Sequence, residues 1–155
     1  MRKKDILEKY PAVRENVLLI LHELQDTNPQ NYLQEEDLAL VANYLNTTLS
    51  SIYGIVTYYS MFSLKPRGRH IVRICQSPVC DMHGCANLLG KLQRILKIDL
   101  GETSQGGLFT LESTECVGRC DQAPIISVDQ DYYGNLSDLE LENVVRKYDG
   151  TIEIK

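Results

Sequence analysis

The placement of cysteine is the feature that most constrains what this chain can fold into. All five cysteines of the 155 residues lie at residue 75 or later, and four of them form two pairs, Cys75-x4-Cys80 and Cys116-x3-Cys120. An odd number of thiols with no sign of secretion argues against a disulfide framework. Clustered cysteines in a reducing compartment more often bind metal or do redox chemistry. We therefore expect the second half of the chain to be built around sulfur ligands.

Composition and charge exclude several other classes. The chain is 43% hydrophobic and 24% charged, which is ordinary for a globular protein, and its formal net charge is −5. That acidity provides no basic surface for nucleic acid. No segment approaches the roughly 18 uninterrupted apolar residues of a membrane helix, and the N-terminus resembles neither a signal nor a transit peptide. We expect a bacterial cytoplasmic protein that binds no nucleic acid and does not itself insert into a membrane.

Residues 1–65 contain no cysteine and show helical periodicity in three segments. The apolar stripes comprise Val13, Val17, Ile20, Leu21 and Leu24; Leu38, Val41, Ala42 and Leu45; and Ile52, Ile55, Val56 and Tyr59. Pro11 suits the first position of the first helix, the acids at 35–37 suit the beginning of the second, and residues 46–48 are expected to cap the third. Short amphipathic helices bury such stripes most simply against one another, so we predict a small helical bundle.

The pattern changes after Lys65-Pro66-Arg67-Gly68, where proline and glycine mark a boundary. Strands are predicted over residues 70–75 and 108–111, with a hairpin over 125–128 and 132–133; helices are predicted over 85–96 and from a capping box at 137–140 to about 149. Strand, helix, strand, hairpin and helix form a compact α/β layer over residues 66–155. The fold class predicted for the whole chain is therefore an α+β arrangement of two modules.

Each cysteine pair is expected in a loop that follows a strand. Gly118, between Cys116 and Cys120, can adopt positive φ and let the main chain approach a cluster closely. Two pairs match a [2Fe–2S] cluster, which takes two thiolates on each iron. Structural zinc uses similar spacings, and disulfides or inert buried thiols are a third alternative. Spacing alone leaves all three open.

Several segments of the sequence resemble one known family. They are Gly101-Glu102-Thr103, Gly107-Leu108-Phe109-Thr110-Leu111-Glu112, Glu115-Cys116-Val117-Gly118-Arg119-Cys120, Ala123-Pro124 and Tyr133-Gly134-Asn135-Leu136, together with Tyr32-Leu33, Val41-Ala42, Val56-Thr57-Tyr58-Tyr59, Phe62 and Pro66-x-Gly68. From about residue 11 to residue 147 the chain resembles the thioredoxin-like [2Fe–2S] ferredoxins. This family includes the 24 kDa (E) subunit of NADH dehydrogenase and small subunits of NAD-linked and bifurcating hydrogenases and formate dehydrogenases.

The resemblance implies a helical bundle over residues 1–65 that docks a partner, followed by a thioredoxin-like domain. It implies that Cys75 and Cys80 bind one iron of a single [2Fe–2S] cluster, and that Cys116 and Cys120 bind the other. Pro124 falls where thioredoxin-like domains often have a cis-proline.

The function implied is that of an electron-transfer subunit in an NAD(H)-dependent oxidoreductase complex. The cluster would exchange single electrons with a flavin, and the sequence contains no nucleotide-binding motif of its own. FMN and NAD(H) are therefore expected on a partner, a flavin- and NAD(H)-binding iron–sulfur subunit. The sequence does not distinguish a quinone reductase from a hydrogenase, a bifurcating enzyme or a formate dehydrogenase as the parent complex. The alternative is a zinc-stapled thioredoxin-like interaction module without redox activity.

Three residues near the pairs admit two interpretations each. Cys85 lies on an apolar helical stripe and is expected to be a small buried residue rather than an alternate ligand or redox partner. His83 is expected to face solvent rather than to bind iron. Arg119 lies between two predicted ligands; it is either a solvated loop side chain or a charge that stabilises the reduced cluster and raises its reduction potential.

A cluster of tyrosines in the first module also has two interpretations. Tyr53, Tyr58 and Tyr59 lie close together in the third predicted helix. At helical spacing such residues more often belong to a core than to an interface, and we expect them in the core.

Overall fold

A computed structural model describes residues 3–150 of the chain, which divides into two compact units. The first unit ends at Arg67, and the second begins at Gly68. The first is helical, and the second contains a four-stranded mixed sheet, so the fold class is α+β. Among the described residues, no helix is both long and apolar enough to cross a membrane.

The first unit consists of four α-helices and one short 3-10 helix. They are α1 (Lys3–Leu7), η1 (Arg14–Asn16), α2 (Val17–Asp26), α3 (Glu35–Tyr44) and α4 (Leu49–Tyr58). Its core is a single cluster of buried apolar side chains that includes Ile20, Leu21, Leu38, Val41 and Ile52. The three predicted stripes therefore pack against one another, as amphipathic helices must, except for Val13 and Tyr59, which are exposed.

The beginning of the first predicted helix is wrong. The carbonyl of Pro11 accepts hydrogen bonds from the Val13 N–H at 2.8 Å and from Asn16 Nδ2 at 2.9 Å, so the chain turns here. Regular α-helix starts only at Val17, after η1. The short helix α1, which precedes Pro11, was not predicted.

The other two helices of this unit begin where capping residues place them. In α3 the Asp37 carboxylate accepts from the Gln34 N–H at 2.9 Å, as part of a capping box. In α4 the Thr48 hydroxyl accepts from the Ser51 N–H at 3.2 Å, which confirms the predicted cap. These side chains satisfy backbone N–H groups that the first helical turn leaves without partners.

The prediction that the three tyrosines lie in the core is wrong. Helix α4 buries Ile52 and Val56, which are four residues apart and therefore on one face. Tyr53 and Tyr58 lie off that face, with Tyr58 81% exposed, and Tyr59 is also exposed. The stripe that carries the burial is narrower than the sequence pattern suggested, and it leaves an aromatic surface in contact with solvent.

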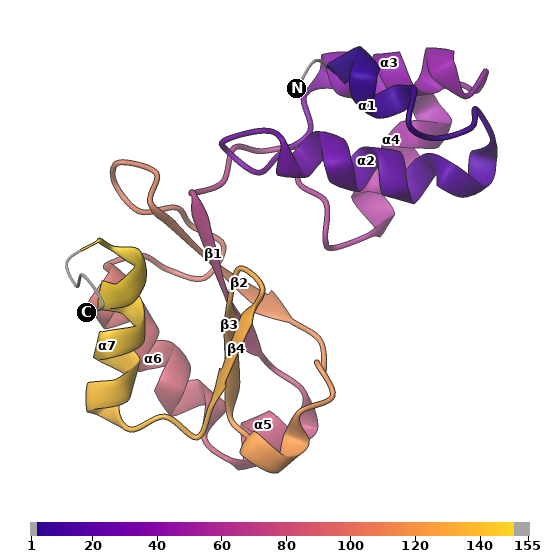
Figure 1. The fold of residues 1–155 in the computed structure, drawn as a ribbon. Coiled ribbons are helices and arrows are strands. Elements are labelled where there is room, and N and C mark those ends of the chain that lie inside the picture. The colour runs from indigo at the N-terminus through magenta and orange to yellow at the C-terminus, as the bar shows by residue number, and fades with distance from the viewer. Residues whose placement is uncertain (1–2, 151–155) are drawn as a thin grey trace. The chain divides into compact units, whose positions relative to one another are not determined.

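The second unit contains a sheet, three α-helices and one 3-10 helix. Its elements are β1 (His70–Cys75), α5 (Pro78–Met82), α6 (Cys85–Leu96), β2 (Phe109–Thr114), η2 (Cys120–Gln122), β3 (Ile125–Val128), β4 (Asp131–Gly134) and α7 (Asp138–Tyr148). The strand order is β2-β1-β3-β4; β1 pairs parallel with β2 and antiparallel with β3. Helices α6 and α7 lie on the same side of this sheet (Figure 1). Their apolar faces close one core with the inner strands.

Strand register brings the ends of β1 and β2 and the beginning of β3 to one edge of the sheet. Cys75 at the end of β1 is opposite Thr114 at the end of β2, and Ile74 is opposite Ile126 near the beginning of β3. The segments after β1 and β2 and before β3 therefore meet at this edge. It is where the cysteine-bearing segments of the chain must meet.

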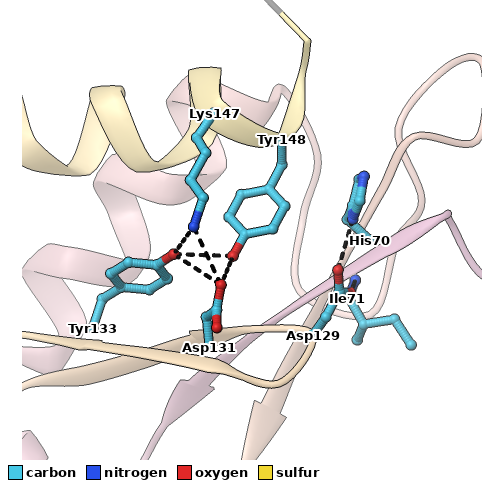
Figure 2. A network of polar contacts seen from close by, with 7 residues as sticks. All are labelled: His70, Ile71, Asp129, Asp131, Tyr133, Lys147 and Tyr148. Carbon is cyan, nitrogen blue, oxygen red and sulfur yellow. Dashed lines mark hydrogen bonds and ion pairs between the residues drawn. The ribbon is translucent and has the colours of Figure 1, made fainter. Parts of the chain in front are cut away.

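The opposite edge of the sheet is fastened by polar contacts. Figure 2 shows the Asp131 carboxylate accepting from the Tyr148 hydroxyl at 2.5 Å and from Lys147 Nζ at 3.2 Å, with the Tyr133 and Tyr148 hydroxyls 2.9 Å apart. These contacts join α7 to β4. The Ser137–Glu140 capping box at the other end of α7 is present as predicted.

Candidate metal centre

Four of the five cysteines gather at the edge where β1 and β2 end. Cys75 is the last residue of β1, and Cys80 lies two residues into α5. Cys116 lies in the loop after β2, and Cys120 begins η2. All five cysteine thiols are free.

The prediction that both pairs lie in loops is correct for Cys116 and wrong for the other three cysteines, which lie at the end of β1, in α5 and at the beginning of η2. Cys80 is on the short helix α5, which Pro78 begins at its first turn after the N-cap residue Ser77. Proline is well suited to that position because the N–H it lacks would have no helical partner. The Ser-Pro sequence was the signal for this helix.

The first pair contacts the segment that carries the second pair. The Cys75 sulfur interacts with the Cys80 thiol and with the backbone N–H of Val117, which lies between the second pair. The charge of Cys75 acts to raise the pKa of Cys120, and the charge of Cys120 acts to raise the pKa of Cys80. The fold thus brings together sulfurs that are 36 or more positions apart in the sequence, counted from Cys80 to Cys116.

The geometry of the second pair suits shared ligation of one tetrahedral metal. The sulfurs of Cys116 and Cys120 are 3.6 Å apart. Two thiolates about 2.3 Å from one tetrahedral ion lie roughly 3.8 Å apart, so little movement is needed. Within residues 3–150 no group of three or more Cys, His, Asp or Glu side chains is arranged to hold a metal ion.

Backbone N–H groups point at the sulfurs. The Gly118 N–H donates to the Cys116 sulfur at 3.4 Å, and Gly118 has φ +76°. A positive φ is costly for a residue with a Cβ, so glycine allows the turn that aims this N–H. The predicted role of Gly118 in a close main-chain approach therefore has a structural basis.

The thiol pKa values of the first pair are shifted in opposite directions. Burial raises the pKa of the Cys80 thiol to about 11, and the neighbouring Cys75 adds to the rise. Burial also acts to raise the pKa of Cys75, but hydrogen bonds from Ser77, Cys80 and the Val117 N–H outweigh it and lower that pKa below its usual value. The polar groups around Cys75 thus favour its thiolate, the form that binds metal.

The second pair is exposed. A hydrogen bond with Cys116, together with the charge of that thiol, raises the pKa of Cys120. Two adjacent thiols resist losing both protons because their negative charges repel. A bound metal ion would remove this penalty by supplying positive charge.

Cys85 is buried, as predicted, at the beginning of α6. Its thiol donates to the Cys75 carbonyl at 3.1 Å, so it supports the main chain of a predicted ligand. His83 is exposed, directly after α5, also as predicted. The Ala123–Pro124 peptide bond is cis.

The roles of two residues near this edge, Gly134 and Tyr132, were not predicted. Gly134 lies against the segment that follows Cys120; a Cβ on it would be 2.3 Å from the Gln122 carbonyl oxygen. The Arg119 guanidinium lies 4.9 Å from the centroid of the Tyr132 ring, on β4. Nothing in the sequence links Tyr132 to Arg119, because the contact depends on how β4 pairs in the sheet.

The chain is similar to known proteins over most of its length. Residues 3–149 match the family model of the thioredoxin-like [2Fe-2S] ferredoxin. The chain is 34% identical to the E subunit of NADH-quinone oxidoreductase from Aquifex aeolicus (strain VF5) over 139 residues, which cover 90% of this chain and 86% of that protein. It is 28% identical to the HndA subunit of the NADP-reducing hydrogenase from Solidesulfovibrio fructosivorans over 142 residues, covering 92% and 82% of the two chains.

A solved structure shares the fold. A chain of an NAD+-reducing [NiFe]-hydrogenase in the H2-reduced state superposes with a TM-score of 0.78 at 20% identity. The superposition covers 92% of this chain but 24% of the hydrogenase chain, and at this identity it establishes the fold alone. The family match, which spans both units, carries the assignment: the chain belongs to the thioredoxin-like [2Fe–2S] ferredoxin family.

Proposed function

We propose that this chain is an electron-transfer subunit in which Cys75 and Cys80 bind one iron, and Cys116 and Cys120 the other iron, of a single [2Fe–2S] cluster. The observation that carries the proposal is the meeting of the two cysteine pairs at one edge of the sheet, with the Val117 N–H directed at the Cys75 sulfur. When bound, such a cluster accepts and releases one electron at a time.

The protein groups around the sulfurs have separate tasks in this proposal. Ser77 and the Val117 N–H stabilise negative charge on Cys75, and the Gly118 N–H does so on Cys116. Hydrogen bonds to ligand sulfurs are among the factors that set the potential of such sites. The buried first pair anchors the site to the core, and the exposed second pair leaves one side open to an electron donor or acceptor.

The proposed partner is a protein that binds FMN and NAD(H) and carries a further iron–sulfur cluster. NADH delivers two electrons as a hydride, so a flavin must separate them before a one-electron site can accept them. Relatives of the chain are named as subunits of NADH-quinone oxidoreductase and of an NADP-reducing hydrogenase, which supports a place in a complex of this type. Reduced thiols and NAD(H) chemistry fit the bacterial cytoplasm.

Exposed apolar side chains support docking in both units. Met82 and Val79 on α5 are exposed next to Cys80, with Met82 86% accessible. In the helical unit, Tyr53 and Tyr58 are exposed on α4. We propose that the helical unit docks the partner, because exposed tyrosines supply large contact areas at little cost in conformational entropy.

The deciding experiment is spectroscopy on the chain purified without oxygen. We expect visible absorption that bleaches with dithionite, about two irons and two sulfides per chain, and an S = 1/2 EPR signal. A colourless protein that reconstitutes only with zinc would replace the proposal with a zinc-stapled interaction module. If the cluster is present, co-purification from the native host would identify the flavoprotein and with it the parent complex.

A further inference from the structure

Arg119 is the one permanent cation in the two segments that carry the cysteines beyond β1 and β2. Residues 76–84 and 115–122 contain the acids Asp81, Glu115 and Asp121 and, as basic residues, only Arg119 and His83. Reduction adds a negative charge at the proposed site, and these three acids oppose it. A cation held nearby favours the reduced form in proportion to how close it stays.

An exposed arginine on a loop does not by itself supply a fixed charge. Its side chain samples many rotamers in water, and salt screens a charge that spends its time away from the site. Here, however, the Arg119 guanidinium lies 4.9 Å from the centroid of the Tyr132 ring. Guanidinium groups are held over tyrosine rings by cation–π attraction and stacking.

Tyr132 is well placed to act as a rigid support. It lies in β4, opposite Ser127 of the fully buried strand β3, while its neighbour Tyr133 contacts α7 through Tyr148. Successive side chains of a strand point to opposite faces, so Tyr132 is on the face away from α7. Its backbone is therefore fixed by the sheet while its ring remains available to Arg119.

We propose that Tyr132 is a positioning residue that holds the Arg119 guanidinium beside the Cys116–Cys120 loop and thereby raises the reduction potential of the site. This inference rests on the proposed function, since it concerns the potential of a bound cluster. The inference goes beyond the proposed function because it assigns a role to Tyr132, which is neither a proposed ligand nor a neighbour of one in sequence.

The test measures the midpoint potential of the loaded protein for four variants. Arg119→Ala is expected to make reduction about tenfold less favourable, a shift of about 59 mV to more negative potential for one electron. Tyr132→Leu, which removes the ring, is expected to shift the potential in the same direction by a smaller amount. Tyr132→Phe keeps the ring and should match the wild type. Arg146→Ala removes an equal charge from α7 and should also match it.

The double variant isolates the positioning role. If Tyr132 acts through Arg119, adding Tyr132→Leu to Arg119→Ala produces no further shift. An equal shift in both backgrounds, or no shift in Tyr132→Leu alone, overturns the inference. An NMR readout is independent of potential: the Arg119 side-chain protons should lose their ring-current shift in Tyr132→Leu and keep it in Tyr132→Phe.

Failure of the inference and failure of the proposed function give different results. Iron and sulfide are measured first on every variant. If the wild type carries no cluster, both the proposed function and the inference are rejected. If all variants carry two irons and two sulfides but their potentials are equal, only the inference is rejected.

Discussion

The two cysteine pairs meet at one edge of the sheet but occupy different environments. Cys75 and Cys80 are 1% and 2% exposed and belong to the same buried cluster as the apolar faces of α6 and α7. Cys116 and Cys120 are exposed and are held by a turn at Gly118 and by the short helix η2. The first pair is therefore part of the fold, whereas the second is carried on a loop that the fold positions.

This difference assigns different tasks to the two proposed iron sites. Side chains in a packed core cannot move without disturbing their neighbours, so the first pair fixes the location of the site. Loops on a rigid scaffold are where chemistry is usually presented to other molecules. The second pair is thus the side at which we expect electrons to enter or leave.

The largest expected effect is on thiol reactivity. In the cluster-free chain at pH 8, iodoacetamide should modify Cys116 at least about a hundredfold faster than Cys80, because alkylation of a buried thiol requires local opening. The pKa of about 11 for Cys80 further reduces its reactive thiolate. Peptide mass spectrometry over time measures both rates. Buried Cys85 is the internal control and should react as slowly as Cys80; equal rates at Cys80 and Cys116 would remove the distinction between the pairs.

A second prediction compares serine substitutions in the two pairs. Cys80→Ser and Cys116→Ser should each abolish a full complement of two irons. Only Cys80→Ser places a hydroxyl in the core, and it should lower the free energy of unfolding of the cluster-free chain by about 1–3 kcal/mol. Cys116→Ser, at an exposed position, should change it by less than about 0.5 kcal/mol.

Urea unfolding and iron analysis on the same preparations provide both readouts of the serine variants. An equal loss of stability in the two variants would contradict the view that the first pair alone is a core element.

The third prediction concerns the support beneath the second pair. A methyl group at residue 134 would lie 2.3 Å from the Gln122 carbonyl oxygen, so Gly134→Ala must force β4 and the η2 main chain apart, which we expect to displace Cys120. We expect a loss of about 1–3 kcal/mol in stability and a reduced iron content. Gly90→Ala is the matched control: a Cβ there has no atom within 4 Å, and alanine favours the helix by up to about 1 kcal/mol. Full iron content in Gly134→Ala would show that the loop does not depend on this contact.

The smallest expected effect lies at the opposite edge of the sheet. A hydrogen bond from Tyr148, and then the Lys147 ammonium, hold the pKa of Asp131 below its usual value. A depressed carboxyl pKa stabilises the folded state above the unfolded pKa of about 3.9, and this contribution is lost as the pH falls through the folded pKa. Urea midpoints of the wild type should therefore decline more steeply below about pH 4 than those of Asp131→Asn. Identical pH profiles would show that this contact contributes nothing.

Parts of the fold followed from local sequence and parts did not. The helix over residues 85–96 and the Ser137–Glu140 cap were predicted, because periodicity and capping depend on residues within one or two turns. The beginning of the first helix was wrong because Pro11 is compatible with a turn as well as with a first helical position. The tyrosines of α4 were misplaced because periodicity cannot reveal how wide a face the neighbouring helices cover.

The sequence by itself determined that four of the cysteines form two closely spaced pairs, and its motifs identified the family. Only the tertiary structure decided that the first pair is buried and the second exposed, that Gly134 supports η2, and that Tyr132 faces Arg119. The physical reason is that spacing is a local property of the chain. Burial, close approach and stacking depend instead on strand order and register, which join residues distant in sequence.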